Sequence, residues 1–180
     1  MKFADVPESE RKQARHPHEY FLVNLITNHI LVFVALLGMA KQEPWLLLIV
    51  PIFSVVVLTY LMWRAKLSRG RDPWFVFCHW QLCARRSRFF IGMILLMGLG
   101  IAAILASVGG DPADLRPGHY AIGGMVILPT LFTVLVLILM ESDAVHKARV
   151  GEVPDGLVRR YPPPSEYRAI AQPEPVTVAE

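Results

Sequence analysis

The stretch CHWQLCARRSR, Cys78 to Arg88, holds two thiols and a histidine beside three arginines. Thiolates and imidazoles are ligands for metal ions, and paired thiols can also carry redox chemistry. On a helix, His79 and Cys83 stand four residues apart and share a face, whereas Cys78 and Cys83 are turned about 140° from each other. The spacing therefore favours a shared pair of metal ligands over a disulfide.

Two ligands do not complete a metal site, because structural zinc takes four. His16 and His18 precede the first apolar block and could supply the others. The resulting candidate group is His16, His18, His79 and Cys83. The simpler interpretation is that Cys83 packs as a small apolar residue and that His79 lies near the lipid headgroups. We therefore expect no cofactor, and we keep this metal site as an alternative.

His29 is the only histidine well inside an apolar block, so it is the candidate axial ligand for a haem. A second ligand would have to come from His79 or from a partner protein. The same block carries Asn24 and Asn28, which can hydrogen-bond to neighbouring helices as His29 can. Helix packing is the simpler role for these three polar residues, and haem binding is the alternative.

The elements that position these residues are long and apolar. Of the 180 residues 54% are hydrophobic, and the mean hydropathy is +0.42. Residues 20–40, 45–63, 89–108 and 121–140 contain no Asp, Glu, Lys or Arg. Each block approaches the roughly 20 residues that a helix needs to cross a bilayer. The sequence predicts an all-α integral membrane protein with four transmembrane helices.

The cationic residues predict how the chain is threaded. Sixteen of the 18 Lys and Arg residues lie in the segments 1–19, 64–88 and 141–180, and only Lys41 and Arg116 lie in the other two connections. Cytoplasmic loops of membrane proteins carry such an excess. Both termini are therefore expected in the cytoplasm of a bacterial inner-membrane protein. The net charge of +3 follows from this threading and from contact with anionic lipid, so no nucleic-acid partner is expected.

The basic segment 64–88 is expected to end in a short interfacial helix. Asp72 and Pro73 are typical of a helix start. We expect Trp74 and Trp80 to insert near the headgroups, and the cations that follow to contact anionic lipid, namely Arg85, Arg86 and Arg88. The Pro-rich tail 141–180 is predicted to extend the fourth helix briefly and then to be extended or disordered.

The third block contains a small-residue stripe, Gly98, Ala102 and Ala106, at intervals of four residues. Small residues on one face let another helix approach closely in lipid. The stripe predicts a helix contact, either with the fourth helix or with another protein.

The sequence carries no G-x-S-x-G, H-E-x-x-H or P-loop motif, and no carboxylate within an apolar block that could drive proton-coupled transport. We therefore expect an accessory, assembly or scaffold component of a membrane complex rather than an enzyme. Its expected partners are membrane lipids and either another membrane protein or a second copy. A metal- or haem-handling protein and a channel or transporter subunit are the two alternatives.

Overall fold

A computed structural model describes residues 1–39 and 42–170. Every element in these ranges is helical. In chain order they are α1 (Glu8–Val23), the π-helix η1 (Asn24–Val32), α2 (Phe33–Leu37), the 3₁₀ helix η2 (Pro44–Leu48), α3 (Ile49–Leu67), α4 (Trp74–Ser107), the 3₁₀ turn η3 (Pro112–Asp114), α5 (Pro117–Val150) and α6 (Asp155–Arg160).

Four of the helical segments are long and apolar enough to cross a membrane. They run over Glu8–Leu37, Trp45–Leu67, Trp74–Ser107 and Pro117–Val150. The prediction of an all-α membrane protein with four such helices is confirmed at this level. The segments are longer than the apolar blocks, because polar but helix-compatible residues extend them at the end that carries Met1.

The expected interfacial helix is not a separate element in the structure. Residues from Trp74 onward form the first turns of α4, a single helix of 34 residues. No Pro or Gly interrupts the chain between Trp74 and Phe90, so the helix can continue without a break. At the start of α4, Asp72 accepts two hydrogen bonds of 2.8 and 3.0 Å from the guanidinium of Arg64, which closes the connection from α3.

Residues 151–170, which the sequence predicts to be extended or disordered, have a defined path that contains α6. Gly151 ends α5 with a φ of 76°, and a side chain there would lie 2.9 Å from the carbonyl oxygen of Phe3. The chain then runs beside the N-terminal residues, with backbone hydrogen bonds Phe3 N–H to Gly151 O at 2.9 Å and Ile170 N–H to Lys2 O at 2.8 Å. Residues 171–180, the rest of the predicted tail, lie outside the described residues.

An aromatic cluster holds the folded tail against the bundle. The rings of Phe3 and Trp74 lie 5.2 Å apart and those of Trp74 and Tyr167 lie 5.1 Å apart. The Tyr167 hydroxyl donates to Glu10 at 2.8 Å, and burial together with this carboxylate raises the pKa of the phenol. Apolar residues that are widely spaced in the tail are buried here: Val153, Leu157, Val158 and Tyr167.

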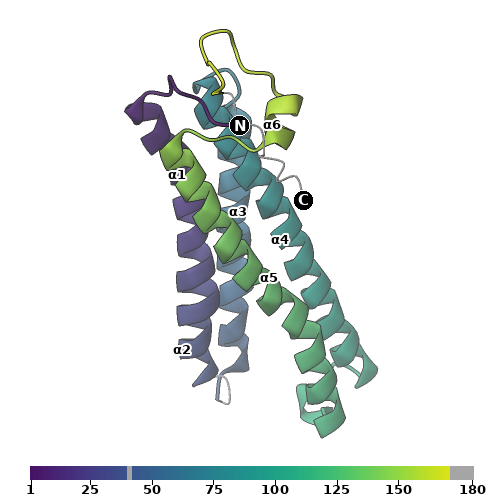
Figure 1. Ribbon diagram of the computed structural model, residues 1–180. Helices are drawn as coiled ribbons and strands as arrows, with labels where there is room; N and C mark the ends of the chain where they lie inside the picture. Colours follow the sequence, from purple (N-terminus) through teal and green to yellow (C-terminus); the bar gives the residue numbers. More distant parts are fainter. Residues whose placement is uncertain (40–41, 171–180) are drawn as a thin grey trace, which may run out of the picture.

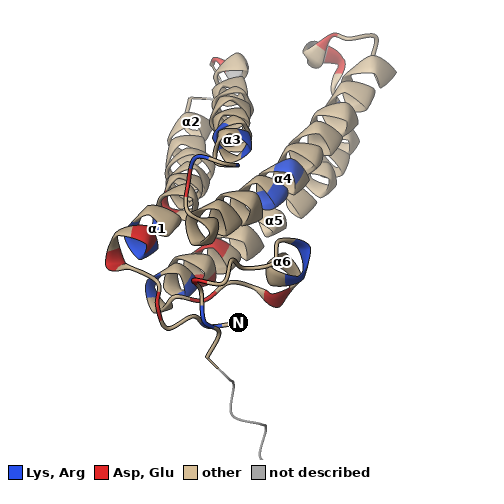
Figure 2. Cartoon of the chain, turned by 90° about the horizontal axis from the view of Figure 1, so that it is seen from above, with Lys and Arg blue, Asp and Glu red and all other residues tan. Residues whose placement is uncertain are grey.

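The helices form two hairpins that cross near one end (Figure 1). The first hairpin runs from α1 to α3, and the second contains α4 and α5; α1 packs against α4 and α5, and α3 packs against α4. We call the end that contains Met1, the α3–α4 connection and α6 the charged end. The other end, with the α2–η2 and α4–α5 connections, is the far end. Basic and acidic residues gather at the charged end (Figure 2).

Most of the buried core lies in the half of the bundle nearer the charged end, although Val50 and Ser54 of α3 are buried farther along. No residue of α2 is buried, the last buried residue of α4 is Ile94, and the first of α5 is Thr130. The far halves of α4 and α5 still touch each other, since a side chain at Gly100 would lie 2.6 Å from Val126. The molecule is therefore tightly packed at one end and open between the hairpins at the other.

The aromatic cluster yields a test of the folded tail. Phe3 is 1% exposed, so Phe3→Ala should lower the free energy of unfolding by about 3–5 kcal/mol, the usual cost of emptying a buried aromatic site. Limited proteolysis of the full-length protein in detergent should then cut residues 151–170 more rapidly than in the wild type. Ile170→Ala is the control, because that side chain is 46% exposed. Equal protection of all three proteins would contradict the packing described here.

Candidate functional site

A buried polar network joins three helices just inside the charged end. It contains His18 from α1, His79 and Arg86 from α4, and Glu141 from α5. The side chains of His18 and Glu141 are fully buried, and Arg86 is mostly buried. Burying a carboxylate is costly unless it is paired and hydrogen-bonded, so the contacts of Glu141 determine whether these helices can pack together.

Both oxygens of Glu141 have partners. His18 Nδ1 lies 2.5 Å from Oε2, and Arg86 donates from Nη1 to Oε1 at 3.1 Å. The same Arg86 nitrogen donates to the carbonyl oxygen of Met140 at 3.0 Å. Arg86 thus binds two neighbouring groups of α5: the backbone carbonyl of Met140 and the side-chain carboxylate of Glu141.

The network continues from His18 to His79. His18 Nε2 lies 3.0 Å from His79 Nδ1, and His79 Nε2 lies 3.2 Å from the carbonyl oxygen of Glu152. A carbonyl oxygen can only accept, so His79 Nε2 carries a hydrogen. His79 Nδ1 is then the acceptor in a neutral ring, and His18 Nε2 donates to it.

These three contacts need three hydrogens, one for each. Two neutral imidazoles supply only two, and both are already used by the His18–His79 and His79–Glu152 contacts. The short contact between His18 Nδ1 and Glu141 therefore requires one further proton, shared between the ring and the carboxylate, or else a cation in its place. Without either, two lone pairs would face each other in a buried site.

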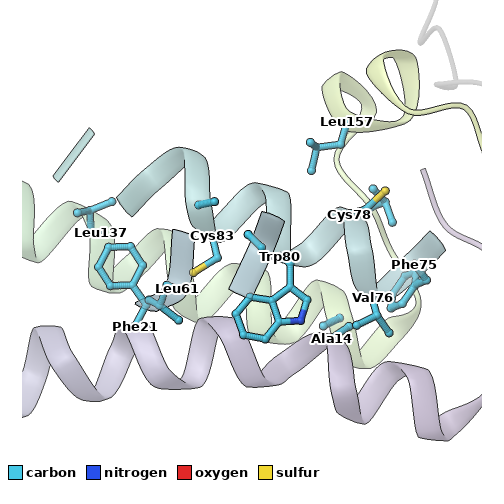
Figure 3. Packing of buried hydrophobic residues seen from close by; sticks show 14 of the residues in the cluster. Ala14, Phe21, Leu61, Phe75, Val76, Cys78, Trp80, Cys83, Leu137 and Leu157 are labelled. Atoms are coloured by element: carbon cyan, nitrogen blue, oxygen red, sulfur yellow. The ribbon is translucent and has the colours of Figure 1, made fainter. Parts of the chain in front are cut away.

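Cys83 lies beside this network. Its thiol is fully buried and lies 3.4 Å from the carbonyl oxygen of Pro17. One ligand atom from each of His18, Cys83 and Glu141 lies within 4.8 Å of the other two. Cys78 is also a free thiol, but its side chain points in a different direction from that of Cys83 (Figure 3).

The structure brings together His18, His79 and Cys83 from the predicted metal group and leaves out His16. The His16 ring is partly buried and lies 6.2 Å from that of Tyr20. Glu141 and Arg86 complete the network, and Glu141 is not among the residues predicted from the sequence. The feature that could have indicated Glu141 is its position directly after the fourth apolar block.

A second polar cluster lies deeper in the bundle, where η1 meets α3. The amide nitrogen of Asn24 donates to Ser54 Oγ at 3.0 Å, and His29 Nε2 lies 2.8 Å from the same oxygen. Asn28 donates to the carbonyl oxygen of Val50 at 2.8 Å. In a π-helix the hydrogen bonds join residues five apart, so Asn24 and His29 can share a face that an α-helix would not give them.

The predicted haem ligands are engaged in other contacts. Besides its contact with Ser54, the His29 ring lies 5.0 Å from the ring of Phe90. The second predicted ligand, His79, uses both ring nitrogens in the network. No pair of free histidine nitrogens faces a common space at these two residues, and we make no proposal for haem.

The residues predicted to contact lipid fall into two groups. Arg85 and Arg88 are exposed, and Arg85 and Arg86 line a groove of about 600 Å³ between α4 and α5. Trp80, however, is only 5% exposed and lies beneath the guanidinium of Arg64 at 4.9 Å. Trp74 donates to the carbonyl oxygen of Tyr161 at 3.0 Å. Trp80 therefore packs inside the protein against α3, whereas Trp74 is half-buried against the folded tail.

The network predicts a strong dependence on Glu141. Glu141→Gln removes the negative charge that neutralises Arg86 and the shared proton. We therefore expect the free energy of unfolding to fall by about 3–5 kcal/mol, as for other broken buried ion pairs. Asp143→Asn on the same helix is the matched control. Its partner Lys147 is also near the surface, so the cost should be about 0–1 kcal/mol. Denaturant titration in detergent measures both, and equal effects would contradict the network.

The deeper cluster predicts a smaller effect. Ser54→Ala removes the oxygen that Asn24 and His29 share, and should destabilise the protein by about 0.6–2 kcal/mol, the range measured for hydrogen bonds between membrane helices. Ser107→Ala is the control, since that hydroxyl is exposed and donates to Ile104 in its own helix at 2.6 Å. The same titration distinguishes the two variants, and a neutral Ser54→Ala would show that the shared oxygen does not hold η1 to α3.

Comparison with known proteins gives no family for this chain: no protein-family model, curated protein or solved structure matches it.

Proposed function

We propose that the protein is an accessory or assembly component of a complex in the inner membrane of a bacterium, with its charged end in the cytoplasm. The orientation is supported by the excess of Lys and Arg in the segments at that end, as in other membrane proteins with cytoplasmic basic loops. The proposal assigns no catalytic step to the protein.

One observation carries the proposal: toward the far end, the described parts of α2, α4 and α5 contain no buried residue. None of the residues of α2 is buried, and the same holds for α4 beyond Ile94 and α5 before Thr130. Helices in lipid associate through close packing and hydrogen bonds rather than through a hydrophobic driving force. Two hairpins that pack this little at one end offer their surfaces to a further helix.

The small-residue stripe on α4 supports a helix as the occupant. Gly98, Ala102 and Ala106 are exposed, and a side chain built at Gly98 meets no atom within 4 Å. Close contact within the protein uses Gly100 on the other face instead. We therefore assign the stripe to a transmembrane helix of another membrane protein, because small residues are the usual means of close helix approach in lipid.

Site-specific photo-crosslinking in native membranes tests this assignment. A photoreactive leucine analogue replaces Leu95, which lies three residues before Gly98 and is 59% exposed. The control places the same analogue at Leu139, which is 72% exposed but lies in the packed half. We expect a discrete protein adduct from Leu95 and only lipid adducts from Leu139.

A bulky residue in the stripe provides the specificity control. Gly98→Leu should abolish the adduct formed at Leu95 without changing the stability of the isolated protein, since the space around Gly98 is open. An adduct with twice the mass of the chain would mean that the protein pairs with itself, and lipid adducts alone at both positions would mean that no helix docks here. Either result would overturn the proposal.

A further inference from the structure

We propose that His18, Cys83 and Glu141 bind one divalent transition-metal ion of the zinc class, at the point where α1, α4 and α5 meet. One nitrogen, one sulfur and one oxygen donor lie within 4.8 Å of one another, and all three residues are fully buried. Imidazole, thiolate and carboxylate are the three side-chain ligands that zinc takes in proteins, whereas calcium and magnesium prefer oxygen alone.

The hydrogen count in the network fits a cation at His18 Nδ1. His18 Nε2 and His79 Nε2 already use the two hydrogens of neutral rings. Nδ1 of His18 therefore presents a lone pair toward Glu141, and the 2.5 Å contact between them needs a positive charge. A metal ion bound to both groups meets that need in place of the shared proton once the two atoms separate to about 3.3 Å, the spacing of two tetrahedral ligands about 2.0 Å from zinc.

The exchange of protons for metal also preserves the charge of the site. Without metal, the group contains the Arg86 guanidinium, the Glu141 carboxylate, one shared proton and a neutral Cys83 thiol, for a net charge of +1. With a divalent ion bound, the shared proton and the thiol proton leave, and the guanidinium, carboxylate, thiolate and metal again give +1. Binding thus releases two protons and buries no additional net charge, which avoids the main cost of a charged buried site.

His79 has the position of an outer-shell partner. Histidines that bind metal usually donate their other ring N–H to a fixed acceptor, which sets the tautomer and the ring orientation. Here His18 donates from Nε2 to His79 at 3.0 Å, and His79 is fixed in turn by the Glu152 carbonyl at 3.2 Å. Arg86 has the same role for Glu141, since it holds the oxygen that does not face His18.

Three protein ligands leave one position of a tetrahedral zinc site open. The hydroxyl of Ser87, one turn after Cys83, is fully buried and is a hydrogen-bond partner of the Cys83 thiol. It can accept or donate a hydrogen bond to a water molecule in the fourth position. The groove between α4 and α5 is lined by Arg86 and Leu137, so open space reaches one member of the network.

The experiment is a binding titration of the full-length protein, purified in detergent without metal. Zn²⁺ affinity is measured by competition with a chromophoric chelator, and Co²⁺ serves as a spectroscopic substitute. We expect one ion per chain and, with Co²⁺, a sulfur-to-cobalt charge-transfer band in the near ultraviolet, which reports a bound thiolate directly.

Matched cysteine variants test the ligand assignment. Cys83→Ser should abolish the charge-transfer band and weaken Zn²⁺ binding by more than the roughly 10- to 100-fold that loss of an outer-shell partner costs, and His79→Gln should show that smaller loss. Cys78→Ser is the control, because that thiol is equally buried but lies outside the group. It should retain both the band and the affinity.

Size-exclusion chromatography and circular dichroism confirm that each variant is folded before titration. Serine differs from cysteine by one atom, so Cys83→Ser is the variant least disturbing to the core. Absence of stoichiometric binding in the wild type, or equal behaviour of the Cys83 and Cys78 variants, would overturn the site.

Discussion

The fold depends on the neutralisation of one buried carboxylate. Glu141 is the first acidic residue after the fourth apolar block, and helix packing places it inside the bundle with no exposure. An isolated carboxylate could not remain ionised there. Its two oxygens therefore fix the relative positions of three helices, since one requires Arg86 of α4 and the other requires His18 of α1. Because the Arg86 side chain also reaches the Met140 carbonyl, a shift of α4 along α5 would break two contacts at once.

The same constraint explains why the protein is closed at one end and open at the other. Polar contacts in a low-dielectric interior are strong only when every member has a partner, and the network meets this condition near the charged end. The Asn24, His29 and Ser54 contacts, nearer the middle of the bundle, join η1 to α3 within the first hairpin. The hydrogen bonds of His18 with His79 and Glu141, which join the two hairpins, lie near the charged end. By contrast, α4 beyond Ile94 and α5 before Thr130 bury no residue, and apolar side chains in lipid gain little by leaving it for one another. The separation of the hairpins follows from where the polar contacts end.

Much of the architecture could be predicted from the sequence, because uncharged blocks of about 20 residues have few alternatives to a membrane helix. The sequence did not predict two kinds of feature: contacts between residues far apart in the chain, and the change from α-helix to π-helix. His16 and His18 are two residues apart, so about 200° of helical rotation lets only one of them face the bundle. The nine-residue π-helix that aligns Asn24 with His29 has no recognised sequence pattern. The fold of residues 151–170 depends on contacts with Phe3 and Trp74. Widely spaced apolar residues such as Val153 form no sequence pattern from which contacts with residues so far away in the chain could be predicted.

The first membrane-spanning segment carries residues of both polar clusters, and in each cluster they join this segment to other helices. His18 holds α1 to α4 and α5, and six residues later Asn24 begins the π-helix that holds it to α3. Phe21, which lies between them, and Leu25, which follows Asn24, are fully buried, and the Phe21 ring lies 6.2 Å from Phe90 of α4. The two polar clusters are therefore separated by a tightly packed apolar layer. Among the described residues, the contacts of His18 are with His79 and Glu141 and those of His29 are with Ser54 and Phe90. We therefore place the chemistry of the network at the charged end and leave the far half for contacts with other helices.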